Sequence, residues 1–188
     1  MYKVTFNGKE NEINTDVSLF SPSGPDRGTL SMLGHVTFEP SFKVLDLGCG
    51  TGIVSVAAAS YGVLPENIVM TDIDELAVKT ALMNMSRNGF DGAIGVSGDG
   101  LTNVPGKDYD LILSNPPYHT DFKVAKAFIE KGFNRLKIGG RLFMVTKRKD
   151  WYKNKIISVF GGVRIYEEDG YFVFEASKRS ASYASKKR

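Results

Sequence analysis

The chain has 188 residues, of which 42% are hydrophobic and 24% are charged, and its formal net charge is +3 at pH 7. These values predict one soluble globular domain and exclude a low-complexity chain. One cysteine excludes an internal disulfide, no apolar run approaches the roughly 20 residues of a membrane span, and the first residues lack the apolar core of a signal peptide. We therefore expect a cytoplasmic protein with no membrane partner.

An Asn-Gly pair near the start of the chain predicts a β-hairpin. The stretch 4–9, which contains Asn7-Gly8, is followed by a second strand-like stretch at 12–14, and this pair is favoured in two-residue hairpin turns. A looser stretch then leads into a short helix that begins at about Asp26. We expect residues 1–42 to form a hairpin and a helix that pack on a core domain of residues 43–177.

Residues 44–52 read Val-Leu-Asp-Leu-Gly-Cys-Gly-Thr-Gly, and a helix-like stretch follows at 53–60. A hydrophobic strand thus runs directly into three alternating glycines. Glycine lets the backbone approach a ligand closely, and amide groups at the start of a helix favour negative charge. The alternative is a tight turn without a ligand, but three glycines in five residues exceed what a turn needs.

The spacing of these glycines departs from two common phosphate-binding patterns. After Gly48 and Gly50, the third glycine of the dinucleotide-binding pattern would fall at Ile53, and no Lys-Ser or Lys-Thr pair follows the loop. The motif instead favours a zwitterionic or nucleoside-like ligand. In that arrangement Asp46 faces a cationic group of the ligand.

Acidic residues end the next two predicted strands. The strand at 67–72 ends in Asp72, at a place where doubly wound sheets carry a carboxylate for ribose hydroxyls, and Ile73 can pack on an adenine ring. Asp74 is expected to cap the following helix. A third short strand, starting at Gly95, ends near Asp99, which either accepts from an adenine amine or serves only a Gly-Asp-Gly turn.

Asn115-Pro116-Pro117-Tyr118 follows the apolar run 109–114, which predicts a buried parallel strand. Proline donates no backbone hydrogen bond, so this segment leaves the sheet as a stiff loop at the carboxyl end of the strand. The Asn115 side-chain oxygen and the Pro116 carbonyl then offer two acceptors, and Tyr118 offers an aromatic face. This combination suits a planar amine, such as the exocyclic amine of a nucleobase. The alternative is a loop that only ends the strand.

The last part of the chain predicts a strand at 141–146 and a terminal antiparallel hairpin from 163–166 and 171–175. Two basic clusters accompany these elements. Lys147-Arg148-Lys149 follows a strand at the predicted ligand-binding edge. This cluster either contacts RNA phosphates or is part of an ordinary solvated surface. Residues 178–188 contain five basic residues and no acid, which predicts a disordered tail.

Taken in order, these motifs resemble class I S-adenosylmethionine-dependent methyltransferases. They are more closely similar to the small-domain methyltransferases related to bacterial ribosomal RNA guanine-N2 methyltransferases. The segment 20–30 resembles the part of that family that leads into its first helix. The resemblance covers most of the chain, and it implies an α/β, Rossmann-like fold with a seven-stranded, mostly parallel sheet and a reversed last strand.

The resemblance also implies a role for each motif. The glycines would border the methionine part of S-adenosylmethionine, Asp72 would bind its ribose, and Ile73 and Asp99 would bind its adenine. The acceptor amine would be held by the catalytic segment 115–118. The expected cofactor contacts are Asp46, Gly48, Gly50, Gly52, Asp72, Ile73, Asp99 and Asn115. The expected substrate contacts are Tyr118, His119, Lys147, Arg148 and Lys149.

We therefore expect a metal-free enzyme, monomeric or weakly dimeric, that methylates an exocyclic nucleobase amine, with guanine N2 of ribosomal RNA as the implied target. Its partner would be ribosomal RNA or a ribosomal particle. The best-known guanine-N2 enzymes have phenylalanine in place of Tyr118 and a second, degenerate domain copy, for which this chain has no room. Two alternatives remain: a glutamine-amide methyltransferase acting on a release factor, and a non-catalytic RNA-binding module.

Overall fold

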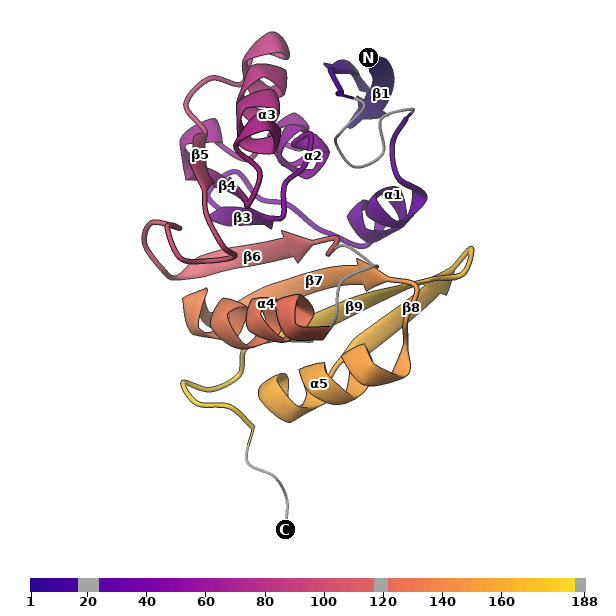
Figure 1. Ribbon diagram of the computed structural model, residues 1–188, viewed down its shortest axis with the longest axis vertical. Helices are drawn as coiled ribbons and strands as arrows, with labels where there is room; N and C mark the ends of the chain where they lie inside the picture. The colour runs from indigo at the N-terminus through magenta and orange to yellow at the C-terminus, as the bar shows by residue number, and fades with distance from the viewer. Residues whose placement is uncertain (17–23, 117–121, 185–188) are drawn as a thin grey trace.

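The computed structural model describes residues 1–16, 24–116 and 122–184. In this part of the chain, seven strands form one sheet in the order β5-β4-β3-β6-β7-β9-β8 (Figure 1). The strands are β3 (Val44–Leu47), β4 (Ile68–Asp72), β5 (Ile94–Ser97), β6 (Tyr109–Ser114), β7 (Leu136–Thr146), β8 (Arg164–Glu168) and β9 (Tyr171–Ser177). The strands from β3 to β7 run parallel, whereas β9 is antiparallel to both β7 and β8. The predicted α/β sheet with a reversed last strand is confirmed.

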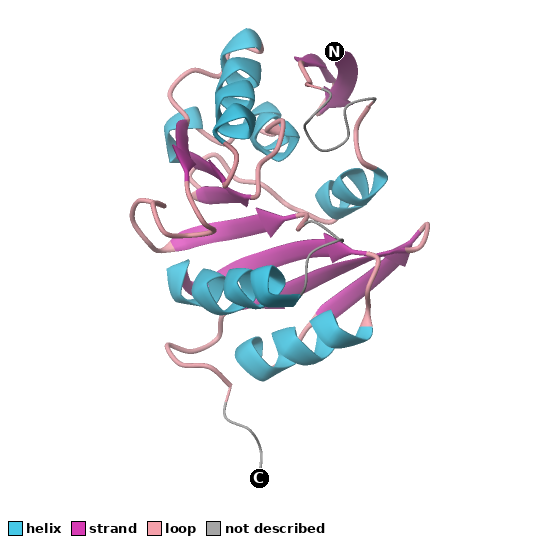
Figure 2. Ribbon diagram, in the orientation of Figure 1, coloured by secondary structure: helices cyan, strands magenta, loops and turns pink. Residues whose placement is uncertain are grey.

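Helices cover both faces of the sheet (Figure 2). One core cluster joins the sheet to α1 (Arg27–Gly34), α2 (Ile53–Ser60) and α3 (Glu75–Arg87), and the other joins it to α4 (Phe122–Arg135) and α5 (Asp150–Phe160). Leu111 and Leu113 of β6 face the first cluster and Ile112 faces the second, so burial on both sides explains the continuous apolar run. A short 3₁₀ helix, Pro65–Asn67, precedes β4. None of the described helices is long and apolar enough to span a membrane.

The predicted N-terminal hairpin is present and packs on the core. β1 (Tyr2–Phe6) and β2 (Lys9–Ile13) pair antiparallel. Asn7 and Gly8 both have positive φ, 49° and 75°, as a two-residue type I′ turn requires. Phe6 and Ile13 are buried in the cluster that contains α1, α2 and α3. The hairpin is therefore part of the same packed unit as the sheet.

The prediction of a disordered tail at 178–188 is wrong for residues 178–184. Lys178 is 8% exposed, and its ammonium donates to the Leu136 carbonyl at 2.7 Å. The Tyr183 ring packs edge-on against Phe133 with 5.0 Å between ring centroids. These partners lie about 40 to 50 positions earlier in the chain, so the local basic composition did not reveal them. Residues 185–188 lie outside the described part.

Candidate active site

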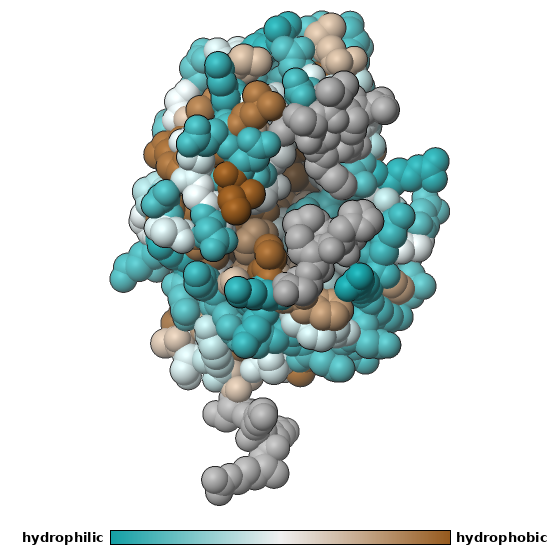
Figure 3. All heavy atoms as spheres, in the orientation of Figure 1, coloured by the Kyte–Doolittle hydropathy of each residue, from teal (hydrophilic) through white to brown (hydrophobic). Residues whose placement is uncertain are grey.

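A cavity of about 370 Å³ opens at the carboxyl ends of β3, β4 and β6. This is the edge of a parallel sheet at which α/β proteins bind ligands. The molecular face in Figure 3 is mostly hydrophilic, with hydrophobic residues gathered near its centre. Seven of the eight residues expected to contact the cofactor line the cavity: Asp46, Gly48, Gly50, Asp72, Ile73, Asp99 and Asn115.

The glycine loop folds back over the end of β4. The amides of Gly48 and Cys49 both donate to the Thr71 carbonyl, at 2.9 and 3.0 Å. Gly48 and Gly50 have φ of 77° and 51°, which glycine adopts at little cost. The Gly50 amide donates to the Asp72 carboxylate at 2.9 Å. The loop is thus held against β4 and exposes its backbone to the cavity.

Gly52, the eighth expected contact, is absent from the cavity wall. A Cβ at Gly52 would lie 2.7 Å from the Cβ of Ala81, and its φ is 76°. Glycine is therefore needed here for the close packing of α2 on α3. The structure thus gives Gly52 a packing role, and its expected contact with the cofactor stays a prediction.

Asp72 and Asp99 reach the cavity from neighbouring strand ends. Besides Gly50, the Asp72 carboxylate accepts from the Asp74 amide at 3.1 Å, and Asp74 caps α3 as predicted. β5 ends at Ser97, and Asp99 lies in the turn beyond it. Asp99 lines the cavity, and its carbonyl also accepts from Thr102 within the turn, so its contact with an adenine amine stays a prediction. Ile73 lines the cavity and is 75% exposed.

Asp46 is more enclosed than the sequence indicated. It is 2% exposed, and one carboxylate oxygen accepts from the Ser55 hydroxyl at 2.8 Å and from the Ser55 amide at 3.2 Å. Burial raises the pKa of Asp46 to about 7, against the opposing effect of the Ser55 hydrogen bonds. Asp46 therefore ties β3 to the first turn of α2, in addition to lining the cavity.

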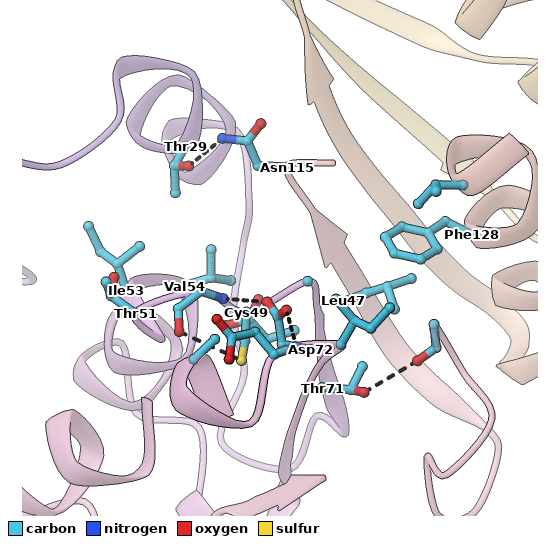
Figure 4. Close-up of a pocket in the computed structure, with 18 of the residues that line it drawn as sticks. Thr29, Leu47, Cys49, Thr51, Ile53, Val54, Thr71, Asp72, Asn115 and Phe128 are labelled. Atoms are coloured by element: carbon cyan, nitrogen blue, oxygen red, sulfur yellow. Dashed lines mark hydrogen bonds between the residues drawn. The ribbon is translucent and has the colours of Figure 1, made fainter. Parts of the chain in front are cut away.

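Asn115 lies at the end of β6 and is held by α1. Its Nδ2 donates to Asp26 Oδ2 and to Thr29 Oγ1, each at 2.9 Å. Figure 4 places Asn115 and Thr29 on one side of the cavity, and Asp72 and Cys49 on the other. Pro116 is buried directly after Asn115. Pro117, Tyr118 and His119 lie outside the described residues.

Three cavity residues from the N-terminal segment were missed: Tyr2, Asp26 and Thr29. The Asp26 side chain caps α1 at Thr29, as a helix starting near Asp26 suggests, but its contact with Asn115 spans 89 positions and has no local signal. Burial also raises the pKa of the Tyr2 hydroxyl. The segment 1–42 is therefore part of the site as well as of the fold.

The basic cluster lies beside the cavity rather than in it. Lys147, Arg148 and Lys149 are exposed after β7, and none of them lines the cavity. Lys149 pairs with Glu167 at 3.1 Å, and the Arg148 guanidinium lies 5.1 Å from the centre of the Phe122 ring. β7 neighbours β6, so the cluster follows the strand next to the one that ends at Asn115.

The cavity also contains the single cysteine of the chain. Burial raises the pKa of the Cys49 thiol, and the nearby Asp46 and Asp72 raise it further, so the thiol stays protonated at neutral pH. In the described ranges, no three His, Cys, Asp or Glu side chains are grouped in a way that could hold a metal ion.

Comparison with known proteins places this architecture in a family. The family described as "Methyltransferase small domain" matches residues 10–175. The chain is 32% identical over 165 residues to ribosomal RNA small subunit methyltransferase C of Pseudomonas entomophila, a match that covers 85% of this chain and 49% of that protein. The protein of the same name from Sodalis glossinidius is 32% identical over 186 residues, covering 94% of this chain and 52% of the relative.

A solved structure shows the same arrangement. The 16S rRNA N2 G1207 methyltransferase (RsmC) of T. thermophilus, in complex with AdoMet and guanosine, superposes with a TM-score of 0.86 at 25% identity. The match covers 95% of this chain and 50% of that one, so this chain spans about half the length of the relatives it matches. On its sequence and its fold, the chain belongs to the methyltransferase small domain family.

Proposed function

We propose that this chain is an S-adenosylmethionine-dependent methyltransferase that acts on guanine N2 of ribosomal RNA. One observation carries the proposal: a single cavity unites the glycine loop, the Asp72 carboxylate and the Asn115 amide. The names of the relatives and the guanosine in the similar structure support the substrate class. We further infer that the enzyme works in the cytoplasm on free ribosomal RNA or on a ribosomal particle, as a monomer or weak dimer.

The residues of the cavity fit this cofactor. A volume of about 370 Å³ lies within the usual range of small-molecule sites. The exposed backbone of the glycine loop suits the methionine part, Asp72 suits ribose hydroxyls, and Ile73 and Asp99 suit an adenine ring. When bound, S-adenosylmethionine supplies a methyl group on a positively charged sulfonium. That group is already activated for transfer.

Asn115 and Pro116 would act on the acceptor. The lone pair of an aromatic amine is conjugated with its ring, so the nitrogen must become tetrahedral to react. The Asn115 side-chain oxygen and the Pro116 carbonyl would accept the amine hydrogens as positive charge develops on that nitrogen. This stabilises charge in the transition state and aligns the amine with the methyl group. Methyl transfer would form a C–N bond and break the C–S bond of the sulfonium, and the amine proton would leave to water.

RNA would approach across the neighbouring rim. Lys147, Arg148 and Lys149 are exposed there and would contact phosphates. Tyr118 and His119, which lie outside the described residues, would contact the target base. Apolar side chains at the cavity, among them Val124 and Phe128, would exclude water from the reacting atoms.

Mass spectrometry of nucleosides tests the proposal. The chain is incubated with methyl-labelled S-adenosylmethionine and small-subunit ribosomal RNA, both naked and assembled into particles. Labelled N2-methylguanosine is the expected product. Label found only in an adenine amine would overturn the assignment, and so would absence of transfer while the cofactor binds.

A further inference from the structure

We propose that Asp26 and Thr29 are positioning residues that fix the orientation of the Asn115 side-chain amide for catalysis. The inference rests on the proposed function and names a further part of its machinery. Both residues belong to the start of α1, which neither the sequence motifs nor the comparisons assign to the reaction. The proposal is based on two hydrogen bonds of 2.9 Å that Asn115 Nδ2 donates, one to Asp26 Oδ2 and one to Thr29 Oγ1. Figure 4 shows the second of them.

These two contacts select one of the two orientations of the amide. An amide nitrogen carries two hydrogens, and Asp26 and Thr29 provide an acceptor for each of them. A flipped amide would instead bring the Asn115 oxygen against the Asp26 carboxylate, where two acceptors would face each other without a proton. The oxygen is therefore kept on the other branch of the amide. A reaction that needs Asn115 as an acceptor needs this orientation.

Asp26 and Thr29 are themselves held rigidly. Asp26 Oδ2 accepts from the Thr29 amide at 2.8 Å, which is the N-cap bond of α1, and from the Thr29 hydroxyl at 3.3 Å. Thr29 is only 4% exposed. A Cβ at Gly28 would lie 2.6 Å from the Tyr171 ring, so α1 packs closely on β9. The start of α1 is therefore fixed relative to the sheet, and its cap residues hold the Asn115 side chain in place.

A set of variants separates this role from support of the fold. Asp26→Ser keeps a good N-cap residue but removes the charge and the reach of the carboxylate. Thr29→Val keeps the shape of the side chain and removes the hydroxyl, whereas Thr29→Ser restores the hydroxyl. Ser31→Ala is the matched control, because its hydroxyl lies on the same helix and donates to Glu168 instead.

The first measurement is methylation kinetics on ribosomal RNA. Asp26→Ser is expected to lower kcat by about 10- to 100-fold, and Thr29→Val by about 10-fold, with little change in the KM for either substrate. Thr29→Ser and Ser31→Ala are expected to stay within about 2-fold of the wild type. In an Asn115→Ala background, Asp26→Ser should cause no further loss of activity, because it acts through Asn115. Full additivity, or a wild-type kcat in Asp26→Ser, would overturn the proposal.

The second measurement needs no turnover. The side-chain amide resonances of Asn115 in ¹⁵N NMR are assigned by their disappearance in Asn115→Ala. In the wild type and in Thr29→Ser these protons should exchange slowly with water, and in Asp26→Ser about 10-fold faster. Identical exchange in Asp26→Ser would overturn the contact. A wild type that methylates no RNA would overturn the proposed function instead. The exchange rates alone would then show whether Asp26 holds the Asn115 amide.

Discussion

At the scale of single residues, Asp72 connects the cavity to the loop around it. Its carboxylate accepts from the amides of Gly50 and Asp74, and its carbonyl accepts from the Gly98 amide at 2.9 Å. One residue thereby positions the glycine loop, the start of α3 and the turn that contains Asp99. Each carboxylate oxygen has two lone pairs, so these contacts are compatible with binding ribose hydroxyls as well.

Asp72→Ala should therefore weaken binding of S-adenosylmethionine by roughly 1.5–3 kcal/mol, the cost of removing hydrogen bonds to a charged group. Isothermal titration calorimetry measures this, with one-to-one stoichiometry expected for the wild type. Asp91→Ala, at an exposed acid outside the cavity, is the control. Equal affinity in Asp72→Ala and the wild type would show that Asp72 does not bind the ribose of the cofactor.

The raised pKa of Asp46 predicts a pH dependence of stability. The folded-state pKa is about 7 against an ordinary value of 3.8, so between these values the folded state holds a proton that the unfolded state has released. The contribution of Asp46 to stability therefore falls as pH rises from about 4 to 7 and then levels off. Urea unfolding across this range should show the wild type becoming less stable relative to Asp46→Asn. Parallel curves for the two proteins would contradict the prediction.

At the scale of elements, the site depends on how closely helices approach the loop. Asn84 of α3 donates to the carbonyls of Asn14 and Thr51, and so joins the hairpin, α3 and the glycine loop. Gly52 allows the same closeness between α2 and α3. The Asn84 hydrogen bonds hold the N-terminal segment beside the glycine loop, and the Gly52 contact lets α2 pack on α3.

Gly52→Ala should destabilise the fold by about 2–4 kcal/mol, because its Cβ would clash with Ala81 and its φ is positive. Gly106→Ala separates the two causes, because Gly106 also has positive φ, 65°, but has open space around it. That control should cost only about 1 kcal/mol. Chemical denaturation measures the stability of both variants. Equal destabilisation would show that close packing on α3 is not the reason why glycine is needed at Gly52.

Predictability from the sequence differed between elements for physical reasons. The apolar run at 109–114 marked β6 because a strand buried on both faces leaves a strong local pattern. β7 starts at Leu136, earlier than the predicted 141–146, because Tyr109 pairs with Leu136 across an irregular register. The contact of Asp26 with Asn115 and the packing of Tyr183 on Phe133 are long-range, so no local pattern announced them.

At the scale of the whole molecule, chemistry and charge share one edge of the sheet. The ends of β3, β4 and β6 form the cavity, and the end of β7 carries the exposed cluster Lys147-Arg148-Lys149. The formal net charge is only +3, so a local cluster rather than the overall charge would guide RNA to the cavity.

Neutralising Lys147, Arg148 and Lys149 together should flatten the salt dependence of RNA binding. The expected change is about 0.7–0.9 in log–log slope for each RNA phosphate that the variant no longer neutralises. Fluorescence anisotropy over a salt series measures the slope. Cofactor affinity should stay unchanged, because none of the three side chains lines the cavity. An unaltered slope would show that these three residues do not contact RNA phosphates and belong to an ordinary solvated surface.

The most direct test of the central claim is the single-turnover methylation rate of Asn115→Ala on ribosomal RNA. Asn115 is proposed to stabilise the amine mainly as it becomes tetrahedral. The rate should therefore fall by about 100- to 1000-fold while RNA affinity changes little. Circular dichroism and cofactor titration would establish that the variant is folded and binds S-adenosylmethionine. A folded, cofactor-binding Asn115→Ala that methylates RNA at the wild-type rate would show that Asn115 does not hold the acceptor amine.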